Sequence, residues 1–92
     1  MEGGSVWKDI FEKWPSEMDR QGVLVTSYEE QIPFDNFLTS EAFLLIERRT
    51  PDTLGARRII IPYGNVVALK LTEVTKSRAF QALGFQLPAA KK

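Results

Sequence analysis

Length, composition and charge limit the function of this chain before any motif is considered. With 92 residues, 43% hydrophobic and 26% charged, the sequence predicts one small globular domain that buries roughly 65% of its unfolded surface. Twelve Lys and Arg residues balance twelve Asp and Glu residues, so net charge predicts no partner. The lack of Cys and His excludes disulfides, thiolate zinc sites, cysteine nucleophiles and the usual general base at neutral pH.

The N-terminal residues predict neither a targeting segment nor a membrane anchor. No basic segment precedes an apolar one, and no apolar run approaches the ~18 residues of a membrane span. We therefore expect a cytoplasmic protein without metal or cofactor. No repeat or linker divides residues 1–92, so we expect a single domain with a helical lid (about 5–21), a barrel (about 22–72) and a C-terminal helix and tail (about 75–92). A domain this small is marginal alone, which favours self-association.

The first predicted element is an amphipathic helix that Ser5 can cap. Pro15 ends it and can open a second short helix over 15–20. The apolar side predicts a lid over one end of a barrel or sheet. A helix on a membrane surface is the alternative, but the polar side carries mixed charges rather than a cationic stripe. The apolar side consists of Val6, Trp7, Ile10, Phe11 and Trp14, at spacings of three and four.

Five β-strands are predicted to follow. The first two, 23–28 and 32–38, are joined by a turn that lacks Asn-Gly or Asp-Gly and should be longer or bulged. The third and fourth, 42–48 and 57–61, flank a loop of Pro, Asp, Thr and Gly, which indicates a hairpin.

A short Pro-Tyr-Gly-Asn loop then leads to the fifth strand, 66–71. The last three strands are apolar on both faces, so something should cover each face. Thr75 can cap a final helix over 76–83, which Gly84 ends. The predicted fold is therefore mainly β: a small, strongly bent five-stranded antiparallel barrel with an N-terminal helix and a short C-terminal helix.

Two stretches of the barrel resemble motifs of a known family. Phe37–Ile46 resembles the end of a first motif, in which an acidic residue stands two positions before a large apolar one, and Ile61–Val67 resembles a second, with a Gly-Asn pair between the last two strands. On these residues the chain is similar to the Sm-like family of Sm and LSm proteins and the bacterial RNA chaperone Hfq.

The resemblance implies a homo-oligomeric ring, of roughly five to seven subunits, with single-stranded RNA on its face or pore. Neighbours in such a ring pair through their last two strands. The implied interface residues are Ile59, Ile60, Ile61, Val66, Val67 and Leu69.

The chain also departs from the family pattern. Asp35 or Asn36 stands where the second strand usually has glycine, so a strongly bent strand must form without it. Leu45 stands where many Sm proteins have an Asn that contacts a base, and Tyr63 stands where an Arg is common. Gly64-Asn65 takes the place of the Lys-His pair of Hfq.

RNA binding needs aromatic faces for bases and cations for phosphates. Phe43 or Tyr63 can supply the first, Asn65 an amide that reads base edges, and four arginines on the two legs of one hairpin the second. Each has a structural alternative: Phe43 as a core aromatic, Asn65 as a turn residue, and the arginines as solubilising, edge-protecting side chains. The candidate RNA-binding residues are Phe43, Tyr63, Gly64, Asn65, Arg48, Arg49, Arg57 and Arg58.

Catalysis is disfavoured because no hydroxyl nucleophile has a base at motif spacing and no Gly-rich phosphate loop or calcium-type acidic loop is present. We therefore expect a protein that is not an enzyme. Two functions remain open: an Sm-like ring that binds single-stranded RNA, and a structural scaffold oligomer of the same fold without nucleic acid.

Overall fold

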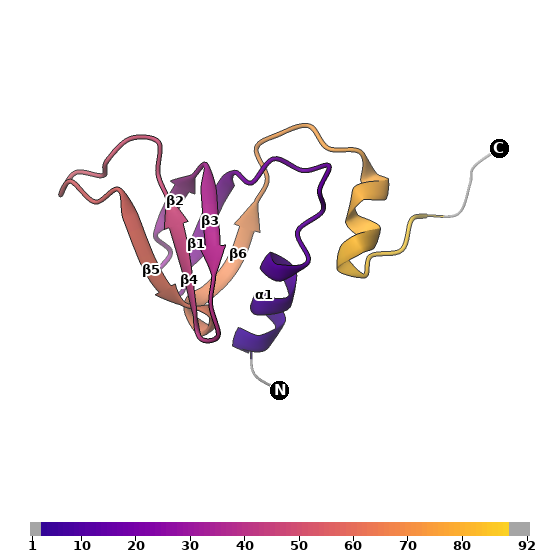
Figure 1. The fold of residues 1–92 in the computed structure, drawn as a ribbon, viewed down its shortest axis with the longest axis horizontal. Helices are drawn as coiled ribbons and strands as arrows, with labels where there is room; N and C mark the ends of the chain where they lie inside the picture. The colour runs from indigo at the N-terminus through magenta and orange to yellow at the C-terminus, as the bar shows by residue number, and fades with distance from the viewer. Residues whose placement is uncertain (1–2, 89–92) are drawn as a thin grey trace.

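The computed structural model describes residues 3–88, and it is built mainly of short β-strands with helical segments at each end (Figure 1). The strands are short because Gly, Pro or a tight turn interrupts the apolar pattern every few residues. In chain order the elements are α1 (Gly3–Glu12), β1 (Gly22–Thr26), β2 (Gln31–Phe34), β3 (Asn36–Thr39), β4 (Phe43–Glu47), β5 (Arg58–Pro62), the 3₁₀ turn η1 (Tyr63–Asn65), β6 (Val66–Lys70) and the 3₁₀ helix η2 (Ser77–Leu83).

The strands form two antiparallel sheets of three strands each. Sheet A has the order β2-β1-β6, and sheet B has the order β3-β4-β5. Only Asp35 separates β2 from β3, and its N–H donates to the carbonyl of Glu47 at 2.9 Å. The predicted second strand is therefore one strongly bent strand whose halves belong to different sheets, and the bend forms without glycine. The prediction of a mainly β fold is confirmed. The predicted barrel is not closed, because residues 3–88 contain no ladder between β5 and β6.

The turns agree with the sequence in part. The first hairpin has the longer form of turn that was predicted, because residues 27–30 separate β1 from β2, and its register is continuous. A bulge lies instead between β1 and β6, where the register shifts between Val25 and Thr26. The strand ends at Thr26 rather than at Tyr28, since Glu29 adopts φ 64° and its N–H donates to the Thr26 carbonyl at 2.8 Å.

The predicted helix over 15–20 is wrong. A single turn forms there, with the N–H of Met18 donating to the Pro15 carbonyl at 3.1 Å. The chain then leaves the helical path, and the indole N–H of Trp14 donates to the carbonyls of Met18 and Asp19 at 3.2 and 3.3 Å. These bonds satisfy carbonyls that a continuing helix would have used.

The predicted caps are also wrong. The helix α1 begins at Gly3, so Ser5 lies inside it rather than before it. Lys76 takes the cap position of η2, while the Thr75 hydroxyl donates to the Glu73 carbonyl at 3.4 Å. The end at Gly84 is as predicted, because Gly84 adopts φ 96° and its N–H donates to Gln81 at 3.0 Å.

The N-terminal helix covers the core, as the lid prediction stated. Phe11 is buried and packs edge-on against Phe37, with ring centroids 4.9 Å apart. Trp14 meets the same ring at 4.8 Å, and the Arg20 guanidinium lies 3.7 Å from its centroid on the chain's way into β1. Burying one such aromatic side chain stabilises the fold by about 1.5–3 kcal/mol. Phe37 is thus the point at which the lid is attached to sheet B.

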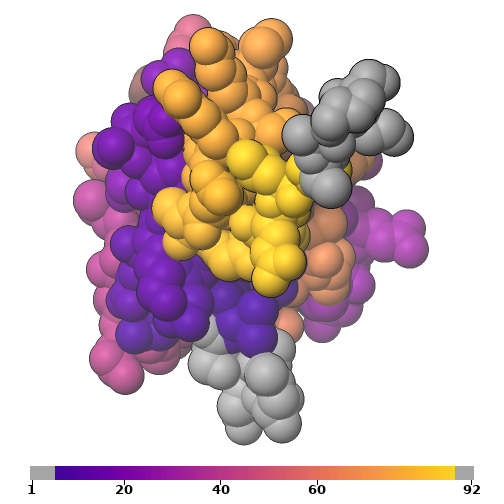
Figure 2. Space-filling view, turned by 90° about the vertical axis from the view of Figure 1, so that its right-hand side faces the viewer, coloured from indigo at the N-terminus to yellow at the C-terminus, as the bar shows by residue number. Residues whose placement is uncertain are grey.

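The C-terminal segment lies beside α1 on one side of the molecule (Figure 2). Together with β6, the two segments bound an apolar groove of about 470 Å³ that Trp7, Leu69, Leu71 and Phe80 help to line. This segment therefore extends the cover that α1 begins.

Candidate assembly and nucleic-acid interfaces

The two sheets each end on a strand with an open edge. β6 is the last strand of sheet A and β5 the last of sheet B, and no described residue forms a ladder on their outer sides. The side chains of β5 alternate between the core and the surface because successive residues point to opposite faces. In β6 the register shift leaves Val67 without a partner on β1, and both Val66 and Leu69 lie toward the core.

The six predicted interface residues consequently divide into two groups. Ile61 and Val66 are buried in the core, and Ile59 and Leu69 pack against it. Ile60 and Val67 face solvent, with exposed fractions of 64% and 54%. The expectation that both faces of these strands are covered therefore fails within one subunit, where only the inner faces are covered.

The loop between β5 and β6 does not present Tyr63 to solvent. The Tyr63 ring is 4% exposed, its hydroxyl donates to the Ser40 carbonyl at 3.2 Å, and burial raises its pKa. The reason is that α1 packs directly on η1. Gly64 and Asn65 are exposed, and the Asn65 carbonyl accepts a hydrogen bond from the Ser27 N–H at 2.8 Å. Asn65 therefore serves the turn, and the Tyr63 ring is not available for stacking in this conformation.

Phe43 is not a core aromatic. It lies on the outer face of β4 with 46% of its surface exposed. The preceding turn holds it there, because the Ser40 hydroxyl accepts a hydrogen bond from the Phe43 N–H at 3.1 Å. Of the two predicted stacking residues, only Phe43 offers a face to a ligand.

The four hairpin arginines differ in how they are compensated. Arg58 pairs with Glu47 at 3.0 Å, and Arg49 pairs with Asp35 at 3.4 Å. The hydrogen bond from Arg58 lowers the pKa of Glu47, with the Asn36 amide assisting.

The remaining two hairpin arginines have no such partner. Within residues 3–88, no salt bridge joins Arg48 or Arg57 to a carboxylate. Their backbones are paired, since the Arg48 N–H donates to the Arg57 carbonyl at 2.8 Å. The folded hairpin therefore brings two arginines without a salt bridge to one end of sheet B, although the Arg48 guanidinium donates to the Thr50 carbonyl at 3.0 Å and its charge helps to lower the pKa of Asp52.

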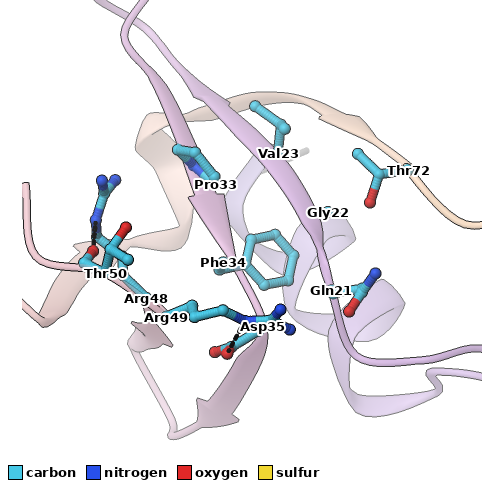
Figure 3. A pocket seen from close by; sticks show the side chains of 10 residues that line it. All are labelled: Gln21, Gly22, Val23, Pro33, Phe34, Asp35, Arg48, Arg49, Thr50 and Thr72. Carbon is cyan, nitrogen blue, oxygen red and sulfur yellow. Dashed lines mark hydrogen bonds and ion pairs between the residues drawn. The ribbon is translucent and has the colours of Figure 1, made fainter.

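A polar cleft of about 250 Å³ opens beside this end of the hairpin (Figure 3). Arg48 and Arg49 line it from one side, and Gly22 and Pro33 line it from the paired strands β1 and β2. In the close-up, Arg49 reaches toward Asp35 at the bend. The sequence missed the contribution of Gln21 and Thr72 to this cleft. The sequence feature that pointed to this cleft was the predicted bend near Asp35, which turns the hairpin toward β1.

One subunit does not bring the stacking and phosphate-binding candidates together. Phe43 is the first residue of β4, and Arg48 directly follows the last residue of that strand. The two are therefore five residues apart along an extended segment. At ~3.3 Å per residue this separates them by roughly 17 Å. The candidate RNA site thus consists of two separate parts, an aromatic one and a cationic one.

Comparison with known proteins gives no further guide to the site. No protein-family model matches the chain, and no match was found among curated proteins or solved structures. In residues 3–88, no helix combines the length and hydropathy that a membrane crossing requires. The same residues contain no group of three or more Asp or Glu side chains placed to hold a metal ion.

Proposed function

We propose that this chain assembles edge to edge into a closed homo-oligomer of the Sm-like type. One observation supports the proposal: the two sheets end on the open strands β5 and β6, and each of these strands exposes a large apolar side chain, Ile60 or Val67. Pairing β5 of one subunit with β6 of the next adds ladder hydrogen bonds and brings both side chains to the contact. Because the two edges differ, the contact is heterologous, and such contacts form a ring when the rotation closes.

The strand order supports the same proposal. With β2 and β3 counted as one bent strand, the order is β6-β1-β2/β3-β4-β5, so β6 and β5 are the first and last strands of a five-stranded layout. In the proposed assembly each neighbour supplies the strand that a closed barrel would have paired within the subunit. A cytoplasmic location stays a prediction of the sequence alone.

Size-exclusion chromatography with light scattering tests the assembly. The wild-type mass should be a multiple of the 10.5 kDa subunit. The double variant Ile60→Lys/Val67→Lys should elute as a folded monomer, because lysines on an open edge oppose strand pairing. Leu54→Lys is the matched control, since Leu54 is 93% exposed at the hairpin tip and away from both edges. A monomeric wild type, or a double variant of unchanged mass, contradicts the proposal.

As a second function, we propose that the assembly binds single-stranded RNA through its hairpin arginines. The observation that favours it is the pair Arg48 and Arg57, which form no salt bridge and whose backbones are hydrogen-bonded, with Arg48 lining the polar cleft. A ring repeats this pair in every subunit, which gives a periodic set of phosphate contacts. The alternative is the scaffold oligomer without nucleic acid.

Fluorescence titration with short oligo-U and oligo-A, at low and at physiological salt, separates these two functions. We expect Arg57→Ala to reduce the slope of log affinity against log salt by about 0.7 per lost phosphate contact. Arg58→Ala should leave the slope unchanged, because Glu47 already holds that guanidinium. Equal effects of the two variants would show that the phosphate contacts are misplaced. Absence of any salt-dependent binding leaves only the scaffold.

A further inference from the structure

The outer face of sheet B carries an apolar patch that no element described above covers. Leu38, Leu45 and Ile60 lie opposite one another on the three strands, so they form a row across the sheet. Phe43 stands beside this row and lies opposite Pro62. We call Leu38, Phe43, Leu45 and Ile60 the sheet B patch; they line a hollow of about 250 Å³.

The charges around the sheet B patch favour a protein partner over a nucleic acid. The next row on the same face is Asn36, Glu47 and Arg58, and it is closed by hydrogen bonds of 3.0 Å from Asn36 and from Arg58 to the Glu47 carboxylate. The cation in this row is therefore already compensated. At the other end of the patch, the turn before β4 carries Glu41, whose carboxylate lies 3.9 Å from the Lys8 ammonium, so that cation is paired as well. The polar residues that help to line the hollow, Thr39 and Ser40, are neutral.

We propose that the sheet B patch packs face to face on the same patch of a second copy, so that two of the proposed rings stack. This inference rests on the proposed assembly. Sheets pack about 10 Å apart, and a two-fold axis that runs across the strands superposes the apolar rows of the two copies. The rows of Asn36, Glu47 and Arg58 then lie at opposite ends of the contact in the two copies, so that Glu47 does not face Glu47. A two-fold axis along the strands would instead place Glu47 against Glu47, and like charges directly opposite are destabilising.

The size of the sheet B patch explains why stacking needs the ring. Leu38, Phe43 and Ile60 are 51%, 46% and 64% exposed, and side chains of this size contribute roughly 300–400 Å² in total with Leu45. A stable interface buries about 800 Å² per partner, so one pair of patches does not hold two monomers together. A closed ring presents one patch per subunit at the same height, and the contacts then act together.

Native mass spectrometry of wild type and Leu38→Lys tests this inference. Leu38 is on β3, two strands and about 10 Å from the β5 edge, so the substitution leaves edge pairing intact. We expect the wild-type mass to be twice that of Leu38→Lys, with equal melting temperatures and with Leu54→Lys unchanged from wild type.

The other outcomes separate the two proposals. Equal ring masses for wild type and Leu38→Lys contradict the stacking and leave the ring. A monomeric wild type contradicts both proposals. If Leu38→Lys has the same native mass as wild type but binds oligo-U more weakly, the sheet B patch binds RNA bases and the stacking inference is wrong.

Discussion

Gly22 stands where β1 and β6 approach each other too closely for any side chain. A Cβ at this position would lie 2.6 Å from the backbone carbonyl oxygen of Lys70, whereas ordinary van der Waals contact begins at 3.4 Å. Gly22→Ala therefore requires a backbone shift of about 0.8 Å at the neighbouring pair Val23 and Lys70. Overpacking of this kind costs about 1–3 kcal/mol. A domain of this length has roughly 5–14 kcal/mol of stability in all, so the loss should be easily measured.

Urea unfolding followed by tryptophan fluorescence measures this loss, since Trp7 and Trp14 report on the lid over the core. We expect the midpoint to fall by about 1–2 M at equal protein concentration. The control is Gly64→Ala, because Gly64 has no positive φ and nothing within 4 Å of its Cβ position. That variant should match or slightly exceed wild type. A Gly22→Ala midpoint equal to that of Gly64→Ala would refute the close approach of β1 and β6.

Two further predictions concern the core and the charges. Phe37→Ala should destabilise the fold by about 3–5 kcal/mol in urea, because Phe37 is fully buried under Phe11 and Trp14, whereas Leu54→Ala should change it by under about 0.5 kcal/mol. Similar losses for the two variants would contradict the lid contact. The N–H groups of Ala56 and then Leu54 lower the pKa of Asp52 below its ordinary 3.8, and Arg58 lowers that of Glu47 below 4.5. Both carboxylates therefore stabilise the fold above these values, and the melting temperature should fall as pH drops from about 5 to 3. Asp52→Asn keeps an acceptor without the charge and should show a smaller fall; an identical fall would rule Asp52 out as a source.

The sequence predicted most of the elements because local signals determine them. Apolar periodicity located α1, and the loop around Asp52 and Gly55 located the β4–β5 hairpin, which the structure shows with Gly55 at φ 91°. The bend at Asp35 was expected on the resemblance and forms without glycine. The helix over 15–20 was wrong because the Trp14 indole binds the carbonyls of Met18 and Asp19, a side-chain contact that propensity does not contain.

The candidate site was harder to predict because burial depends on which element packs over a loop. Tyr63 and Phe43 are both aromatic residues near turns, yet α1 buries the first and nothing in the described residues covers the second. The arginines were predicted to cluster, and the hairpin does pair their backbones. The pairing of Arg49 with Asp35 was not predicted, because 14 residues separate the two in sequence and the bend brings them together.

The separation of the strands along the chain has a consequence for the order of folding. Sheet B joins consecutive strands, whereas sheet A needs the pairing of Val23 with Lys70 across most of the domain. Closing the longer loop costs more chain entropy, and this cost comes before the strand contacts form. We therefore expect the amides of β3, β4 and β5 to become protected from hydrogen exchange first and those of β6 last. Pulse-labelled hydrogen exchange during refolding would show this order, and early protection of β6 amides would disprove it. A chain that has not yet placed β6 exposes the edge of β1 in its place, which makes the last step of folding the one most open to misassociation.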